Sequence, residues 1–540
     1  MSKQPLEDTQ SGIHRAKLWE IAFYALNNTS TNAYMVLVGS ISYFLVGIVG
    51  VAAVLAGSIV TIMRIWDGVT DPFIGMIVDN TNTKFGKNRP FILAGNIVLF
   101  VMTWLMFHII PTIPSGARFF VFIIMYAIYI VGYTLQCVVT KSAQSCLTND
   151  PKQRPIFTMF DATYNVLLMS LFWPVYLSGT LLPKYTLTSA DAADKIAALL
   201  AQSPSLERVI TSNDGIQVLS GFYNPAMWHE AQLTVGLLAA VFACCAIIGL
   251  WRKDNEKYYG LGKVERIGFK DYADVLAHNR GIQMLVLAAS SDKLAMGATT
   301  NAAVTMSLFG IIFGNYALNG SVSAITGIPV ALFGIFGIGT IARNMGQKQC
   351  LLVGTYGSLA SALVLMILII LGHNSGMALP TFQLTNLASW GGLFSPANWS
   401  FTGLLFILAY IAMKGFSQLS GNIVIPMTAD CADYEVYRTG RYVPGLMGTL
   451  FSFVDKLISS LAATIVAIVY ALIGFKEALP TADDPFTGAL LAATLFCYLG
   501  LPAIGWLLNL VAMKFYPLTK DKMAEIQDEI ARIKAEAMAK

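Results

Sequence analysis

Long apolar stretches separated by short polar segments run along the whole chain. Uninterrupted apolar stretches of about 20 residues are typical of transmembrane helices. The pattern therefore predicts an all-α polytopic membrane protein with twelve transmembrane helices. The predicted spans lie near residues 18–46, 51–79, 91–111, 118–146, 156–183, 231–251, 283–315, 320–342, 349–372, 400–428, 445–475 and 487–514.

The composition supports a membrane protein and argues against an enzyme. Of the 540 residues, 56% are hydrophobic and 12% are charged, whereas soluble domains carry about 25% charged residues. The seven cysteines lie mostly in or beside apolar segments, which is typical of small core residues rather than of a disulfide or zinc framework. No stretch resembles an ATP-binding loop, a metal cluster or a nucleophile triad. We therefore expect no enzymatic activity, no cofactor apart from a coupling cation, and no nucleic-acid partner.

Basic residues predict the orientation in the membrane. Most lysines and arginines lie in the N-terminal segment and in loops on its side of the membrane, and few lie in the opposite loops. The opposite loops contain Arg118, Lys184, Lys195, Arg208 and Lys476. Since positive charge is retained in the cytoplasm, both termini are expected to be cytoplasmic, in a multi-pass protein of the cell (inner) membrane surrounded by lipid.

The order of the spans predicts two halves of six helices each. The loop "DNTNTKFGKNRP" after the second span and "ARNMGQKQ" after the eighth both place Gly and Lys after a polar turn. Internal repeats are common in transporters, although short basic loops also recur in unrelated membrane proteins. The predicted parts are a cytoplasmic N-terminus (1–17), a first half (18–251) with an extracellular insertion (184–230), a cytoplasmic linker (252–282), a second half (283–514) and a cytoplasmic tail helix (515–540). The insertion and the tail are expected to form amphipathic helices, the latter resting on the membrane or on the linker.

The stretch "RIWDGVTD" places three charged residues inside the second span. On a helix Arg64, Asp67 and Asp71 share one face. A charged side chain at the bilayer centre costs at least ~2.5–3.5 kcal/mol on insertion scales, so such a group needs a function or a partner. Two interpretations remain open: the carboxylates bind a cation, either Na⁺ or a proton, or an Arg–Asp pair locks two helices together.

The same stretch carries a family resemblance. "RIWDGVTDPFIG", with the following "KFGKNRP", resembles the helix II signature of the glycoside–pentoside–hexuronide:cation symporters, the melibiose-permease-like branch of the major facilitator superfamily. "ADCADYEVYRTG" followed by "FVDKLISS" is similar to the segment leading into helix XI of that family. The resemblance implies the major facilitator fold, alternating access, and uptake of a sugar or glycoside together with Na⁺, H⁺ or Li⁺.

The resemblance also implies roles for individual residues. Asp67 and Asp71 would be the cation ligands, and would hold Na⁺ if transport is sodium-coupled. Lys456, in the middle of the eleventh span, would contact substrate. The residues assigned to gating are Arg64, Gly75, Asp79, Gly86, Lys87, Arg89, Asp430 and Asp433.

The sequence departs from the family at the positions that bind sugar. A sugar-binding Asp of helix I falls on Asn28, and an Asp and an aromatic residue of helix IV fall on Cys137 and Lys141. A helix V Arg falls on Ala162, beside Asp161. The galactoside-type contacts are therefore absent, which leaves the identity of the substrate open.

Span four offers its own polar face, formed by Tyr133, Thr134, Cys137 and Lys141. Lys141 would suit the carboxylate of an anionic sugar such as a uronide. It could equally pair with Asp161, or extend to the cytoplasmic surface. The candidate substrate residues are Asn28, Tyr133, Cys137, Lys141, Asp161 and Lys456.

Polar residues in other spans extend the list of candidates. Ser291, Asp292 and Lys293 are adjacent in span seven, and one of them is expected to pair across the two halves. A stripe starting at Lys414 in span ten would line the cavity or form a helix contact. The function predicted best is cation-coupled symport of a small sugar, glycoside or uronide. The alternatives are a non-transporting sensor or scaffold of the same fold, or a carrier of another small solute such as a lysolipid.

Overall fold

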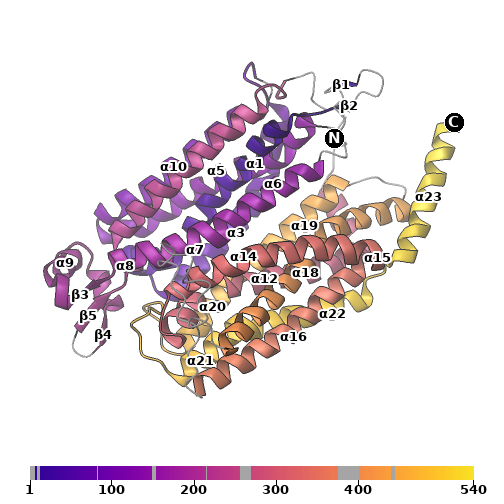
Figure 1. Ribbon diagram of the computed structural model, residues 1–540. Helices are drawn as coiled ribbons and strands as arrows, with labels where there is room; N and C mark the ends of the chain where they lie inside the picture. The colour runs from indigo at the N-terminus through magenta and orange to yellow at the C-terminus, as the bar shows by residue number, and fades with distance from the viewer. Residues whose placement is uncertain are drawn as a thin grey trace. The chain divides into compact units, whose positions relative to one another are not determined.

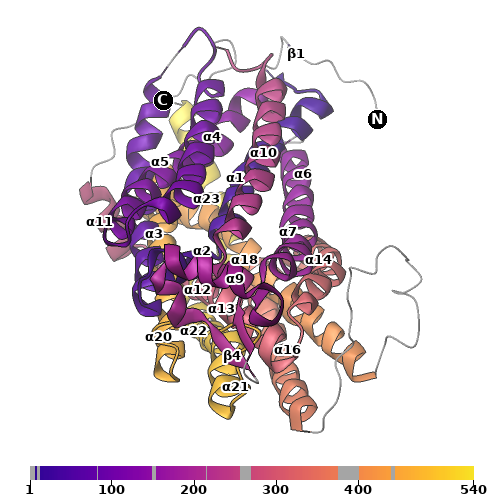
Figure 2. The same ribbon diagram turned by 90° about the vertical axis from the view of Figure 1, so that its left-hand side faces the viewer.

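The computed structural model describes residues 7–8, 13–81, 83–148, 154–213, 216–255, 269–374, 401–439 and 444–539. Within these residues, eleven helices are long and apolar enough to cross a membrane. A twelfth span is obtained if the helices Arg280–Thr299 and Ala302–Ile312, which meet at a bend of 49°, are counted as one. The prediction of an all-α polytopic membrane protein is confirmed, and Figures 1 and 2 show the long helices running side by side within each part of the chain.

The helices form two compact units. The first unit consists of Met1–Lys263 and Gly474–Pro485, and the second consists of Val264–Ile473 and Phe486–Lys540. In the following ranges, η marks short π-helical or 3₁₀-helical turns.

The first unit is built around α1. Its elements are β1 (Glu7–Asp8), β2 (Ile13–His14), α1 (Leu18–Val38), α2 (Ile41–Phe44), η1 (Leu45–Val49), α3 (Ala53–Asn80), α4 (Arg89–Trp104), η2 (Leu105–Ile109), η3 (Ile110–Thr112), α5 (Ser115–Leu147), α6 (Arg154–Val166), η4 (Leu167–Phe172), α7 (Trp173–Tyr176), η5 (Leu177–Leu181), α8 (Leu182–Tyr185), β3 (Leu187–Thr188), α9 (Ser189–Gln202), η6 (Pro204–Val209), β4 (Thr211–Asn213), β5 (Ile216–Leu219), η7 (Gly221–Tyr223) and α10 (Pro225–Leu250). Helix α1 packs against α4, α5, α6 and α10, and Tyr24 and Ile21 of α1 belong to the buried core of this unit.

The second unit is also helical and ends in a tail helix. Its elements are α11 (Phe269–His278), α12 (Arg280–Thr299), α13 (Ala302–Thr305), η9 (Met306–Ile312), α14 (Ala317–Gly337), η10 (Ile338–Ala342), α15 (Arg343–Met345), α16 (Gln347–Asn374), α18 (Phe401–Thr439), α19 (Pro444–Ser459), α20 (Leu461–Leu472), α21 (Gly488–Leu495), η13 (Phe496–Gly500), α22 (Leu501–Phe515) and α23 (Lys520–Ala539). Helix α12 packs against α18, α19, α20 and α22. The tail was expected to rest on the membrane or on the linker. In the structure α23 packs on α18, and Ile526 is fully buried in the core of this unit.

The insertion after the fifth span folds into a small module. Strands β3, β5 and β4 form an antiparallel sheet in that order, with Thr188 opposite Val218 and Ser212 opposite Gln217. The sequence predicted the helix α9 but not the sheet. The module lies at one end of the first unit, beside α8 (Figure 1).

Arg118, at the start of α5, fastens this module to the spans. It is buried, and Nη1 donates to the carbonyl oxygen of Ile48 and to Ser203 Oγ, both at 2.8 Å. Nη2 donates to the carbonyl oxygens of Pro111, at 2.8 Å, and Gln202, at 3.1 Å. A basic residue that orientation rules assign to an external loop therefore has a structural function, because its guanidinium satisfies backbone carbonyls at the ends of several elements.

Residues 474–485 follow α20 in the chain but pack within the first unit. The hydroxyl of Tyr43 donates to the carbonyl oxygen of Pro480 at 2.7 Å, and that of Tyr223 donates to the carbonyl oxygen of Leu479 at 3.0 Å. Arg208 forms an ion pair with Glu477 at 2.7 Å. The end of the first unit that holds the small sheet thus also contains a segment from late in the sequence.

Candidate functional site

Asp67 is the most deeply buried carboxylate of the predicted cation site. It lies in α3, fully buried, and Thr134 Oγ1 of α5 donates to its Oδ1 at 3.0 Å. Arg64 Nη1 lies 3.7 Å from the other carboxylate oxygen. Both a hydroxyl oxygen and a guanidinium therefore face the carboxylate that the sequence placed in an apolar span.

Arg64 does not fully enclose this carboxylate. Its side chain is 38% exposed, and its guanidinium lies 5.9 Å from the centre of the Tyr133 ring. A 3.7 Å separation is an ion pair rather than a short hydrogen bond.

The next two turns of α3 contain two further predicted residues. Asp71, one helical turn after Asp67, is partly buried. Gly75, on the turn after that, has open space where a Cβ would point.

A second polar group joins α1 to α6. Asn28 Nδ2 donates to Asp161 Oδ1 at 2.8 Å, and Asn165 Nδ2 donates to the same oxygen at 3.0 Å. Asn32 Nδ2 completes the group by donating to Asn165 Oδ1 at 2.6 Å. The structure thus brings together two predicted substrate residues, Asn28 and Asp161. Sequence reasoning missed Asn32 and Asn165, although each follows a predicted residue by four positions and so shares its helix face.

The structure describes only some of the residues of the polar face predicted for span four. The Tyr133 hydroxyl contacts Met35 Sδ of α1 at 3.7 Å, and Cys137 is partly buried. The side chains of Lys141 and Asp79 lie outside the described part of the structure. The pairing of Lys141 with Asp161 therefore stays a prediction, as does the gating function of Asp79.

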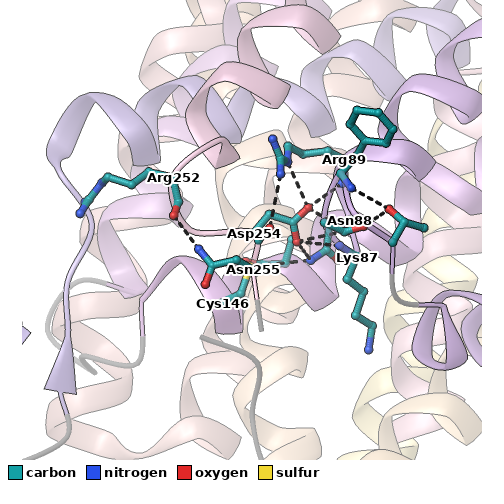
Figure 3. Close-up of polar contacts among 11 residues, drawn as sticks. Lys87, Asn88, Arg89, Cys146, Arg252, Asp254 and Asn255 are labelled. Atoms are coloured by element: carbon teal, nitrogen blue, oxygen red, sulfur yellow. Dashed lines mark hydrogen bonds and ion pairs between the residues drawn. The ribbon is translucent and has the colours of Figure 1, made fainter. Parts of the chain in front are cut away.

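The predicted gating turn is organised around a residue that the sequence analysis did not select. Asp254, which is 1% exposed, accepts the backbone N–H groups of Asn88 at 3.0 Å and Arg89 at 2.9 Å, and that of Lys87 at 3.2 Å (Figure 3). Asn88 Nδ2 adds a bond of 2.9 Å, and Arg89 Nε lies 3.4 Å away. Because α4 begins at Arg89, Asp254 satisfies the N–H group of its first residue and those of the two residues before it, and it meets the positive end of the helix dipole. The sequence feature that could have identified Asp254 is its position as an acidic residue in a basic linker, directly after a span.

Gly86 allows Asp254 to approach this turn. Its φ is +97°, and a Cβ at this position would overlap the Asp254 carboxylate and backbone. A residue with a side chain would therefore be strained in its backbone and would also displace the carboxylate.

Two arginines near this turn have partners of their own. The guanidinium of Arg89 stacks on the Trp251 ring at 4.6 Å, and Arg252 binds Glu20 of α1 through two bonds of 2.8 and 2.9 Å.

The second sequence motif lies at the end of α18. Asp430 and Asp433 are partly buried there, and Glu435, which was not predicted, is 1% exposed. Glu435 accepts a bond of 2.9 Å from Asn279 Nδ2 and one of 2.8 Å from Arg438. Asn279 also caps α12 by accepting the Ile282 N–H at 3.1 Å, so Glu435 supports the start of a helix, as Asp254 does in the first unit.

Two lysines in the spans of the second unit, Lys293 and Lys414, have partners within it. Lys293 Nζ of α12 lies 2.5 Å from Asp455 Oδ2 of α19. Lys456, predicted to contact substrate, is the next residue and is partly buried. Lys414 Nζ reaches Thr299 Oγ1 at 3.3 Å.

The oxygen atoms around Asp67 suit a hard monovalent cation or a proton better than a transition metal. Among the described residues, no group of three or more His, Cys, Asp or Glu side chains could hold a metal ion.

Comparisons with known proteins give matches over nearly the whole chain. The family model described as MFS/sugar transport protein matches residues 23–520. The glucuronide carrier protein homolog of Escherichia coli (strain K12) is 24% identical over 523 residues, covering 94% of each chain. The isoprimeverose transporter of Lactiplantibacillus pentosus is 22% identical over 520 residues, covering 96% of this chain and 92% of its own. Among solved structures, the nucleoside transporter NupG superposes with a TM-score of 0.52 at 9% identity, covering 93% of this chain and 100% of its own, which supports the fold alone.

Proposed function

Because the chain belongs to the MFS/sugar transport protein family, and is therefore a multi-pass membrane transporter and not an enzyme, we propose that it carries a sugar or glycoside together with a monovalent cation. The observation that supports coupling best is the fully buried Asp67 carboxylate, which accepts a hydroxyl from α5 and lies only loosely against Arg64. A carboxylate kept in an apolar span is costly unless it binds a cation or a proton during function. Asp71, one turn away on the same face, would share that cation.

The group around Asp161 is the candidate for sugar recognition. Amide groups and a carboxylate offer both donors and acceptors, which is what the hydroxyls of a sugar require. Tyr133 adds an aromatic ring close to Met35. Lys456 is kept as a separate candidate substrate contact of the second unit. The distribution of basic residues supports a cell-membrane protein with both termini in the cytoplasm, and in that orientation the turn held by Asp254 would gate the cytoplasmic side.

Uptake by purified protein in proteoliposomes tests this function. A gradient of Na⁺ or of protons, applied in separate arms, should drive accumulation of a labelled sugar, and collapse of that gradient with an ionophore should release it. A panel of glycosides and uronides identifies the substrate. A folded protein that accumulates none of these sugars under either gradient would contradict the proposal.

We further propose that the substrate carries a negative charge and that Lys141 meets it. One relative is a glucuronide carrier homolog and another transports the glycoside isoprimeverose, so the family context allows both charged and neutral sugars. Removing one partner of a desolvated charge pair costs roughly 2–5 kcal/mol, which corresponds to about 30-fold to several-thousand-fold in affinity. Lys141→Gln should therefore weaken binding of a glucuronide by that factor and change binding of the matched glucoside much less.

Direct binding of the two sugars to wild type and Lys141→Gln measures this effect. Lys195→Gln is the matched control, because Lys195 is exposed in α9. Equal losses for both sugars would exclude charge recognition and favour the pairing of Lys141 with Asp161. A wild type that prefers the glucoside would argue against an anionic substrate even without the variant.

A further inference from the structure

The second unit contains a buried carboxyl group that has no assigned function. Asp292, in the middle of α12, is 8% exposed, and neither of its carboxyl oxygens has a hydrogen-bond partner among the described residues. Its two neighbours in the chain are bonded. Ser291 Oγ donates to Asn509 Oδ1 at 3.1 Å, and Lys293 pairs with Asp455.

The surroundings of Asp292 are polar but uncharged. Ser420 of α18 and Asn509 of α22 lie beside the carboxyl group. Asn509 Nδ2 is itself buried without a partner in the described structure, as is Ser290 Oγ on α12. Buried polar groups in folded proteins are bonded in the large majority of cases, so an unbonded carboxyl group beside the unbonded amide of Asn509 requires an explanation.

The charged groups on the helices packed against α12 are engaged elsewhere or lie further along their helices. Lys293 and Asp455 pair with each other, and Lys414 contacts Thr299 and the Tyr410 ring. The other described charged or titratable side chains on these elements are Asp274 and His278 on α11, which pair with each other, Arg280 on α12, Lys456 on α19, Lys514 on α22, and Asp430, Asp433, Glu435 and Arg438 toward the end of α18. No ion pair joins any described side chain to Asp292, so an ionised carboxylate there would lack a direct counter-charge.

We propose that Asp292 is a proton-binding site of the second unit, separate from the Asp67 and Asp71 cation site. An ionised carboxylate that is buried without a partner charge is unfavourable, and such a group becomes neutral by forming an O–H bond with a proton taken from water. The resulting carboxyl group can accept from the Asn509 amide through one oxygen and share its O–H with Ser420. A metal ion suits the site less well, because the amide nitrogen of Asn509 can donate but cannot ligate a cation.

This proposal goes beyond the proposed function, because it assigns a proton to a carboxyl group outside the coupling site. It therefore predicts that Asp292 is neutral in the resting protein whichever ion drives transport. The Asp292→Asn variant should fold, because asparagine is a neutral side chain of nearly the same shape. Its thermal unfolding temperature should not fall below that of wild type at neutral pH.

Infrared spectra of the purified full-length protein in lipid test the assignment. The difference between wild type and Asp292→Asn at neutral pH, without Na⁺, should contain the C=O band of a protonated carboxyl group, and this band should shift in D₂O. The Asp194→Asn variant, which changes an exposed residue of α9, should lose only an ionised carboxylate signal.

Each outcome of this experiment decides the proposal. Carboxylate bands in place of the C=O band would show that Asp292 is ionised and would overturn it. Disappearance of the C=O band on adding Na⁺ would make Na⁺ the occupant and would also overturn it. Asp67→Asn should keep the band, so a failure of the coupling site and a failure of the Asp292 site are separate results.

Discussion

Asp67→Asn and Asp71→Asn should each abolish cation-driven accumulation of sugar while the protein remains folded and inserted. Asparagine keeps the shape of the side chain but removes the charge that would hold the cation. Loss of one member of a desolvated charge interaction costs roughly 2–5 kcal/mol, so cation affinity should fall by about 30-fold or more. Transport down the sugar's own gradient can persist, because the substrate residues are unchanged.

The measurement is accumulation in proteoliposomes with and without the cation gradient, together with equilibrium exchange of sugar. Asp194→Asn provides a matched control for the loss of one carboxylate from the first unit. Asp67→Asn should have the larger effect on thermal stability, because Asp67 accepts the Thr134 hydroxyl and is fully buried. Full accumulation by both single variants would show that the two carboxylates are structural and would support an Arg–Asp helix lock.

Asp254→Ala should strongly destabilise the first unit. The substitution removes the acceptor of three backbone N–H groups and of the Asn88 side chain, and leaves the first turn of α4 without a cap. Breaking a buried charged interaction by removing one partner costs about 3–5 kcal/mol. We expect a large drop in the thermal unfolding temperature of the purified protein, with transport lost in proportion to the folded fraction.

Two further variants test whether the loss of stability comes from the contact between Asp254 and the turn before α4. Gly86→Ala should reproduce much of the loss, because a Cβ there would overlap the Asp254 carboxylate and the φ of +97° disfavours alanine. Asn255→Ala should have little effect, because Asn255 is exposed and its side chain donates to a nearby backbone group, the Arg252 carbonyl oxygen. If Asp254→Ala unfolds at the wild-type temperature, Asp254 does not hold this turn.

The sequence predicted features that depend on local pattern. Apolar runs locate the spans because a bilayer demands about 20 such residues, and Asp67 stands out because a carboxylate in such a run is rare. Pairings between distant segments were not predictable in this way. Asp254 lies 165 positions from Arg89, and no periodicity links a linker residue to the start of a helix so far away.

In the polar group around Asp161, the family resemblance identified some of the residues but not others. Alignment to the family selected Asn28 and Asp161 separately, and the structure joins them through a bond of 2.8 Å. The alignment gave no reason to choose Asn32 and Asn165. Their bonds to each other and to Asp161 depend on the angle at which α1 meets α6. One of Ser291, Asp292 and Lys293 was predicted to pair across the two halves. For Lys293 this is wrong, because its partner Asp455 belongs to the same unit.

The segment 474–485 makes the order of synthesis matter for the first unit. Tyr43 precedes its acceptor Pro480 by 437 positions, and Tyr223 precedes Leu479 by 256. At about 5–20 residues per second, a ribosome needs roughly 20–90 s to cover the longer interval. During that time the surface around Tyr43, Tyr223 and Arg208 has no cover from this segment, so the first unit completes its fold only after nearly the whole chain has been made. A nascent chain arrested before residue 474, released from the membrane in detergent, should therefore be cut by added protease within 186–224 more readily than the finished protein.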